Sequence, residues 1–275
     1  LKKRAYAKGG IITGNDAFYL FKKNEFPVED ELSLNLIRTD DIARYYLGVP
    51  SMKVFYPCEL DAKGDTSVMD INSIASNFPE GYSYIMDNED VMKSRKDSRN
   101  TMGDKKNWYQ PVRFGTLSLF KGKKIIGPGI VKHNKFVLDD KGYAYSFGNM
   151  YSIVARDESL NLSVLLGILN SRLIEYYLHS TAPIKQGGYF AYGATVLEKI
   201  PLSYPIGNCA TCIKELVSEV IDIKKNDNIA DTSALENRID FLVYHLYGLT
   251  YDEVLIVDPE TPISREEYEA YNIEQ

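Results

Sequence analysis

The chain has 275 residues, of which 44% are hydrophobic and 25% are charged, and its formal net charge at pH 7 is −6. This length and apolar content predict a globular fold of one large or two smaller domains and exclude an intrinsically disordered chain. No run of about 18 apolar residues occurs, and the first residues lack the apolar segment of a signal peptide. A cytoplasmic location without a membrane anchor is therefore predicted. The sequence opens at Leu1 without a methionine and reads as the continuation of a longer chain.

The first hundred residues predict short extended segments followed by a polar stretch. In chain order we expect extended runs at 11–13 and 17–21 around a Gly-Asn-Asp turn, a helix over 40–48 closed by Gly48, and a strand over 53–57. Residues 61–104 are polar and weakly periodic, which predicts a long mobile excursion with a partial helix over 87–99.

Beyond Trp108 the pattern changes first to strands and then to helices. The expected strands are 124–131, 135–138, 143–147 and 150–155, with a turn at 139–142. The expected helices are 160–178, a short one ended by Pro201, 212–225, 232–248 with a Ser233–Glu236 capping box, and a short one capped by Thr250 and Glu253. The fold class predicted is α+β, with a mixed, sheet-rich domain over 1–205 and a small helical, acidic segment over 206–275.

Charge is strongly separated along the chain. Residues 93–135 hold twelve lysines and arginines against two acidic residues, whereas residues 201–275 hold five against fifteen. A net-acidic protein can present a basic face, because attraction to a polyanion depends on positive charge within about 8–10 Å. We therefore weigh nucleic-acid contact above a plain solvated surface for this basic segment. Its aromatic residues Trp108, Tyr109 and Phe114 are expected in the core rather than stacked on bases.

The chain offers few signs of catalysis or metal binding. Cys209 and Cys212 form one CxxC without further ligands, and the three histidines His133, His179 and His245 are isolated. No phosphate-binding loop or nucleophile elbow is present. Glu59, Asp61 and Lys63 only faintly resemble a nuclease motif. The sequence therefore predicts a binding protein with no catalytic, cofactor-binding or metal-binding residues.

Several stretches together resemble a known family. "GGIITGNDAFYL", "WYQP", "KKIIGPGIV", "LLGILNSRLIEYYL", "GGYFAYGATVLEKIPL" and "RIDFLVYHLYGLTYDEVLIV" occur in this order. They are similar to the C-terminal, TaqI-like target-recognition region of adenine-N6 DNA methyltransferases. Type IIG restriction–modification enzymes, which join nuclease, methyltransferase and recognition domains in one chain, end in the same way. The resemblance spans nearly the whole chain.

The catalytic motifs of such methyltransferases are not found in this sequence. The [DN]PP[YFW] tetrapeptide that holds the flipped adenine and the glycine-bearing turn for S-adenosylmethionine do not occur. The resemblance therefore implies the DNA-reading part of a larger enzyme. Its implied partners are double-stranded DNA and a methyltransferase domain of the same parent chain, with no membrane. S-adenosylmethionine, and Mg²⁺ if a nuclease is present, would bind the parent's other domains.

A domain of this kind must hold duplex DNA and choose one sequence while a base is flipped out. Lysine and arginine contacts to phosphates fix position, and polar side chains read base edges in the major groove. The predicted phosphate contacts are Lys93, Arg95, Lys96, Arg99, Lys105, Lys106, Lys121, Lys123 and Lys124. The predicted base readers are Asn15, Gln110, Arg113, His133, Asn134, Lys135, Lys185 and Gln186.

Two other classes of function stay open on the sequence. One is a protein-interaction module, in which the acidic helices are the functional surface and the basic strip contacts an acidic partner. The other is a nuclease that uses Glu59 and Asp61. Affinity for duplex DNA tests the first, and magnesium-dependent cleavage tests the second.

Overall fold

The computed structural model describes residues 1–146 and 148–271 and is a mixed α+β fold, as predicted. The helices are α1 Asp16–Tyr19, α2 Ile71–Asn77, α3 Pro79–Asp87, α4 Glu89–Ser94, α5 Leu117–Lys121, α6 Leu162–Asn170, α7 Arg172–Thr181, α8 Ala194–Glu198, α9 Gly207–Asn226, α10 Ser233–Leu246, α11 Tyr251–Val257 and α12 Arg265–Ala270. The strands are β1 Ala5–Gly9, β2 Leu20–Lys22, β3 Ser33–Ile37, β4 Ile42–Ala43, β5 Tyr46–Leu47, β6 Met52–Phe55, β7 Cys58–Leu60, β8 Thr66–Val68, β9 Lys96–Asp97, β10 Asn100–Thr101, β11 Lys124–Pro128, β12 Ile130–Val131, β13 Val137–Asp139, β14 Ala144–Tyr145, β15 Met150–Ala155, β16 Ile184–Lys185 and β17 Tyr189–Ala191.

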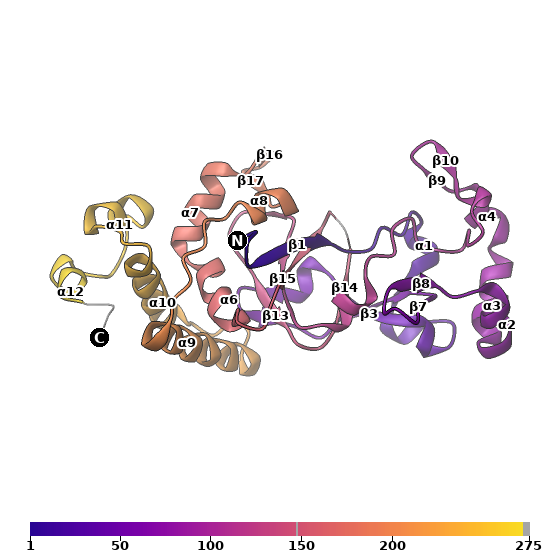
Figure 1. Cartoon of the computed structure of the whole chain (residues 1–275), viewed down its shortest axis with the longest axis horizontal. Coiled ribbons are helices and arrows are strands. Elements are labelled where there is room, and N and C mark those ends of the chain that lie inside the picture. Colours follow the sequence, from indigo (N-terminus) through magenta and orange to yellow (C-terminus); the bar gives the residue numbers. More distant parts are fainter. Residues whose placement is uncertain (147, 272–275) are drawn as a thin grey trace.

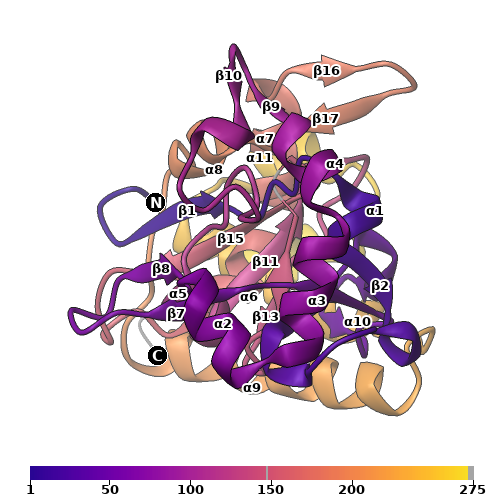
Figure 2. The same ribbon diagram turned by 90° about the vertical axis from the view of Figure 1, so that its right-hand side faces the viewer.

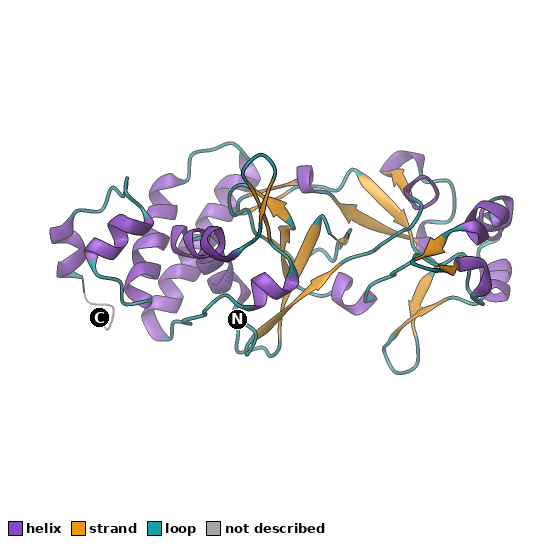
Figure 3. Cartoon of the chain, turned by 90° about the horizontal axis from the view of Figure 1, so that it is seen from above, coloured by secondary structure: helices purple, strands orange, loops and turns teal. Residues whose placement is uncertain are grey.

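The molecule is elongated, with sheets between two helical ends (Figure 1). Helices α9 to α12 form one end and helices α2 to α4 the other. Figure 3 shows the same division from above, with the strands gathered in the centre. Two four-stranded sheets run in the orders β1-β15-β11-β13 and β14-β3-β6-β2. A three-stranded sheet, β12-β17-β16, and the hairpins β4–β5, β7–β8 and β9–β10 complete the strands.

Two large hydrophobic clusters stabilise the fold. One joins the face of β1, β11 and β15 to α6, α7, α9 and α10, and includes Ile153, Leu165 and Val217. The other joins the β14-β3-β6-β2 sheet to α1, α3, α4 and α5, and includes Phe55 and Tyr145. Helices α9 and α10 share the first cluster with β1 and β15, so residues on both sides of the predicted boundary at 205 pack together.

Local patterns gave several elements correctly. The strand at 150–155 is confirmed, and the strand predicted at 53–57 is present as β6, Met52–Phe55. Gly129 divides the predicted 124–131 strand between two sheets. Asp139 accepts the N–H groups of Lys141, Gly142 and Tyr143, which forms the predicted turn. The strand predicted at 143–147 is present as β14, while Phe147 lies outside the described residues. Helix α4 falls within the partial helix predicted at 87–99, and the mobility of that region stays a prediction.

The predicted helix over 40–48 is wrong. Thr39–Asp41 make a single 3-10 turn, after which β4 and β5 pair with Ile42 opposite Leu47. Tyr45 turns the chain with φ 63°, a left-handed conformation that cannot continue a right-handed helix. Its side chain is buried in the first cluster, so tertiary packing fixes this turn.

Two further predictions failed through side-chain capping. The amide oxygen of Asn15 accepts the N–H of Phe18 and starts α1, where an extended run was expected. Ser171 caps α7 through the N–H of Ile174 and divides the helix expected over 160–178 into α6 and α7.

The capping box expected at Ser233 is absent, since the α10 cap is Thr232, whose hydroxyl donates to Glu236 at 2.7 Å. The box at Thr250 and Glu253 is confirmed. No helix in the part of the chain that the structure describes is long and apolar enough to cross a bilayer.

Candidate nucleic-acid interface

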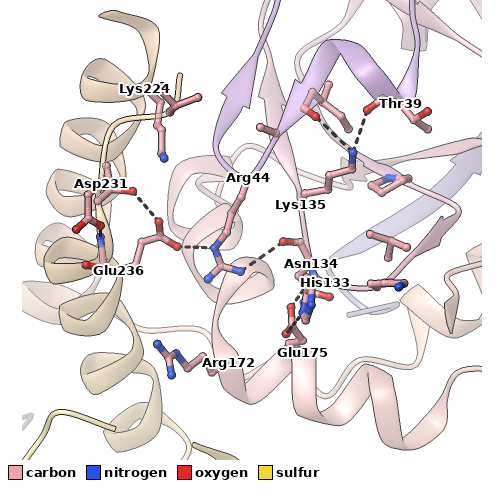
Figure 4. Close-up of a pocket in the computed structure, with 18 of the residues that line it drawn as sticks. Thr39, Arg44, His133, Asn134, Lys135, Arg172, Glu175, Lys224, Asp231 and Glu236 are labelled. Carbon is pink, nitrogen blue, oxygen red and sulfur yellow. Dashed lines mark hydrogen bonds and ion pairs between the residues drawn. The ribbon is translucent and has the colours of Figure 1, made fainter. Parts of the chain in front are cut away.

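A groove of about 1080 Å³ lies between the start of α10 and the segment that joins β12 to β13 (Figure 4). Thr39 to Arg44 form a further side of it, and Tyr189 of β17 reaches its rim. Three consecutive predicted base readers, His133, Asn134 and Lys135, line this groove. The fold thus brings part of the predicted set together at one concave surface.

Of these three side chains only that of His133 is exposed. Asn134 is 1% exposed, and its amide donates to the Leu169 carbonyl and accepts from the Tyr192 hydroxyl, both at 2.8 Å. Lys135 donates to the carbonyls of Thr39 and Ile42. The burial of Asn134 contradicts its prediction as a base reader, because its amide group is enclosed and hydrogen-bonded inside the protein. His133 is exposed, with Nδ1 3.2 Å from a carboxylate oxygen of Glu175.

The arginines of the groove are already neutralised by acidic residues. Arg44 pairs with Glu236 and also donates to the Asn134 carbonyl (Figure 4). The backbone N–H of Arg172 donates to Asp240 at 2.8 Å, and its guanidinium pairs with Asp240 and Asp258. Burial raises the pKa of Asp240 to about 7, although the N–H and guanidinium of Arg172 oppose this rise. These contacts hold α7, α10 and α11 together rather than leaving charge for a ligand.

Arg95, a predicted phosphate contact, instead lies inside the protein. It is 7% exposed, and its guanidinium donates to the carbonyls of Met92, Thr13, Trp108 and Gln110. A guanidinium has five N–H donors in a fixed plane, which suits it to join several chain segments. Arg95 therefore stabilises the base of the β9–β10 hairpin, and four of its five N–H donors are used inside the protein.

Arg113, a predicted base reader, supports the same hairpin from outside. Its guanidinium lies 2.7 Å from Asp97 of β9, and Lys105 lies 3.4 Å from the same oxygen. The hydrogen bond from Arg113 lowers the pKa of the Asp97 carboxyl. The Arg113 side chain is 57% exposed, so it remains available to a ligand.

Lys124, another predicted phosphate contact, is also contradicted. Its ammonium group and the carboxylate of Asp139 are both fully buried, 2.6 Å apart, and the ammonium group also donates to the carbonyls of Phe120 and Gly122. Burial lowers the pKa of Lys124, and Asp139 opposes that effect. The charge pattern alone could not distinguish this core lysine from exposed Lys123.

Some of the other predicted residues are bound within the protein, and others make no side-chain hydrogen bond or ion pair with the residues that the structure describes. Lys93 pairs with Glu89 and lies over the Trp108 ring, and Lys106 pairs with Asp70 at 3.3 Å. Gln110 contributes its carbonyl to Arg95, while the Asn15 amide is used in the cap of α1. Within residues 1–146 and 148–271, six predicted residues are exposed and make no side-chain hydrogen bond or ion pair: Lys96, Arg99, Lys121, Lys123, Lys185 and Gln186.

These exposed residues do not form one continuous strip. Lys96 and Arg99 belong to the β9–β10 hairpin, and Lys185 and Gln186 to the β16–β17 hairpin. Figures 1 and 2 show both hairpins projecting from the same side of the molecule, while α5, which carries Lys121, lies lower in the view of Figure 2. The two hairpins are therefore the basic elements best placed to hold one ligand together.

Two groove residues were missed by the sequence reading, Lys132 and Tyr189. Both are exposed, and the Lys132 ammonium lies 5.1 Å from the centroid of the Tyr189 ring. The one local signal is "KQGGY", in which two glycines form a turn beside an aromatic residue.

The candidate nuclease residues Glu59 and Asp61 lie on the β7–β8 hairpin, where Asp61 stabilises the turn. Glu59 is in β7, and Asp61 accepts the N–H groups of Lys63 and Asp65. The aromatic residues Trp108, Tyr109 and Phe114 pack in or against the second hydrophobic cluster, as expected.

Comparison with known proteins gives a family match and longer relatives. The model of the TaqI-like C-terminal specificity domain matches residues 34–202. The type II methyltransferase M.BstVI of Geobacillus stearothermophilus is 24% identical over 250 residues, which cover 90% of this chain and 40% of that protein. The type II methyltransferase M.XhoI of Xanthomonas vasicola is 24% identical over 248 residues, with coverage of 90% and 41%. The chain thus spans about two-fifths of the length of these relatives.

A third relative and a solved structure agree with this match. The putative type II restriction enzyme and methyltransferase RM.MjaORFECS2P of Methanocaldococcus jannaschii is 34% identical over 116 residues, 37% of this chain and 10% of that protein. The type IIL restriction–modification enzyme MmeI, solved in complex with DNA, is similar with a TM-score of 0.66 and 12% identity. The match covers 97% of this chain and 36% of that chain, and it shows a shared fold.

Proposed function

Because the chain belongs to the family of TaqI-like C-terminal specificity domains, we propose that it recognises a specific sequence in double-stranded DNA for an adenine-N6 methyltransferase of a restriction–modification system. In this role it holds the duplex while a methyltransferase domain elsewhere in the natural chain flips out the target adenine. The family match over residues 34–202 carries this proposal.

The charges of the two projecting hairpins support the proposal. Lys96 and Arg99 on one hairpin and Lys185 on the other are exposed and unpaired among the residues that the structure describes. Such residues can replace the counterions of DNA phosphates, while neighbouring polar side chains read base edges. Arg44 is instead paired with Glu236, and Lys124 is buried beside Asp139.

The chemistry of the complete enzyme follows from the proposed family role. M.BstVI and M.XhoI are named type II methyltransferases, and the relative from Methanocaldococcus jannaschii is named as both a restriction enzyme and a methyltransferase. S-adenosylmethionine then binds the methyltransferase domain, and in a type IIG arrangement Mg²⁺ binds a nuclease domain. This chain supplies target choice.

A methylation assay on the complete natural protein tests the function. Duplexes that carry the cognate site and duplexes with single base-pair changes are compared for transfer of methyl groups to adenine. We expect methylation to fall with most changes inside the site and to be insensitive to changes outside it. Exchange of the segment equivalent to residues 34–202 for that of a relative should transfer the relative's site preference. Unchanged preference after this exchange, in a protein that still methylates DNA, would contradict the proposal.

A further inference from the structure

We propose that Tyr189, Lys132 and Lys185 form a nucleotide-contact surface at the rim of the groove. In it the tyrosine ring packs against a base or deoxyribose of one DNA strand, and the two ammonium groups contact flanking phosphates. This inference rests on the proposed function and names residues that contribute to it, two of which the charge pattern did not indicate.

The backbone fixes Tyr189 on a projecting but anchored hairpin. Strand β17 pairs with β12 through Phe190 and Val131, and with β16 through Tyr189 and Lys185. The Phe190 ring stacks on His179 with 4.0 Å between ring centroids. Since successive side chains of a strand point to opposite faces, this contact directs Tyr189 to the other face. Tyr189 lines the groove and remains 41% exposed.

The turn that follows Lys185 lets another molecule approach closely. Gly187 and Gly188 have φ values of 79° and 74°, which glycine adopts without strain. A Cβ at Gly188 would meet no atom within 4 Å, so the outer side of this turn is open. The hairpin tip therefore presents no side chain at Gly187 or Gly188 to an approaching DNA backbone.

Charge in the groove points to the same three residues. Arg44, Arg172 and Lys135 are held by protein carboxylates or carbonyls, and Lys224 donates to the Ala230 carbonyl. Lys132 differs from these groove residues, since among the described residues it forms no side-chain hydrogen bond or ion pair, and its ammonium lies over the Tyr189 ring. Lys185, opposite Tyr189 in the hairpin, is likewise exposed and unpaired there. Two free cations therefore flank one exposed ring.

An exposed aromatic ring between two free cations has the chemistry that nucleic acids require. Aromatic side chains pack on deoxyribose and on unstacked bases of any sequence, and ammonium groups bind phosphates as point charges. Because neither contact depends on a base edge, this surface should strengthen binding to all sequences alike. It therefore positions the strand, and target choice falls to other residues.

The test measures the affinity of the complete natural protein for a fluorescent duplex of mixed sequence over a range of salt concentrations. The variants are Tyr189→Ala, Tyr189→Phe, Lys132→Ala and Lys185→Ala. The matched controls are Tyr82→Ala on α3 and Lys214→Ala on α9, both exposed and outside the groove. Thermal unfolding of each variant checks that it is folded.

We expect Tyr189→Ala to weaken binding by about tenfold, roughly the loss of one aromatic contact with a base. Tyr189→Phe keeps the ring and should bind within about twofold of the parent. Lys132→Ala and Lys185→Ala should each flatten the slope of log K against log salt by about 0.9, whereas Tyr189→Ala should leave the slope unchanged. The controls should match the parent.

The inference and the proposed function fail in different ways. If the parent protein binds the duplex and Tyr189→Ala behaves like Tyr82→Ala, the inference is wrong while the proposed function stands. Equal salt slopes for Lys132→Ala and Lys214→Ala would also overturn it. If the parent protein has no affinity for any duplex, the proposed function itself is wrong.

Discussion

Lys124 and Asp139 form an ion pair whose side chains are both fully buried, with 2.6 Å between Nζ and Oδ2. Asp139 also accepts three backbone N–H groups in the turn that follows β13. Replacing Lys124 with methionine would leave the Asp139 charge uncompensated in the core. We expect a loss of about 3–5 kcal/mol in the free energy of unfolding, measured by urea denaturation. The neighbouring exposed Lys123→Ala is the control and should change stability little; equal stabilities for the two variants would contradict a structural role.

Arg95 joins four carbonyls from three chain segments, so its removal should loosen the β9–β10 hairpin. Arg95→Ala removes the guanidinium donor from all four carbonyls, and we expect a cost of about 3 kcal/mol in the free energy of unfolding. Lysine at this position cannot reach all four acceptors, so Arg95→Lys should restore only part of the stability that Arg95→Ala loses. Amide hydrogen exchange over residues 96–101 should accelerate in Arg95→Ala but not in Arg99→Ala. Unchanged protection would show that the hairpin does not depend on Arg95.

The stability of the protein should contain a pH-dependent contribution from Asp240. Its pKa is raised from 3.8 to about 7 by burial, so between these values the folded chain binds more protons than the unfolded chain. Stability from this group is therefore fully present below about pH 4 and is lost as pH rises towards 7 and beyond. Asparagine cannot ionise, so Asp240→Asn should reduce the fall in urea midpoint between pH 5 and pH 8. The exposed Glu260→Gln is the charge-matched control, and the same fall in Asp240→Asn as in the parent would refute this assignment.

The unpaired cations of the β9–β10 hairpin should contribute affinity without sequence preference. Lys96→Ala and Arg99→Ala should weaken binding to every duplex alike, and each lost phosphate contact should flatten the salt slope by about 0.9. The measurement is a salt titration of the complete natural protein with cognate and unrelated duplexes. Loss on the cognate duplex alone would instead assign these residues to base reading.

Arg113 tests base reading directly, because it is exposed and held in place by Asp97. Arg113→Ala should lower kcat/KM for methylation of the cognate site by the equivalent of about 1–3 kcal/mol in activation free energy. At sites that already differ at the base that Arg113 reads, kcat/KM should change little. The exposed Arg238→Ala on α10 serves as control and should behave like the parent. Identical losses on all sites would place Arg113 among the phosphate contacts.

Elements with a strong local pattern could be predicted from the sequence, and those set by distant contacts could not. The alternation in 150–155 and the helical face of 212–225 depend on residues close in the chain. The break at Ser171 is a local cap, but the continuous helical spacing of the apolar residues around it conceals it. The left-handed Tyr45 depends on packing against residues far away in sequence. The same holds for the site: the count of lysines and arginines predicted a basic surface, but only the fold separates buried Arg95 and Lys124 from exposed Lys96 and Lys185. Lys132 and Tyr189 were missed because they are 57 residues apart and meet through the pairing of β12 with β17.

The two projecting hairpins are attached to different hydrophobic clusters. Arg95 ties β9–β10 to the segments around Tyr19 and Trp108, in the second cluster, whereas β12 and His179 tie β16–β17 to the first. Either hairpin can therefore be exchanged for one of different sequence or length without repacking the core that supports the other. Evolution, or a protein engineer, can vary the two projecting tips separately, so that new pairs of hairpin sequences arise without rebuilding the fold.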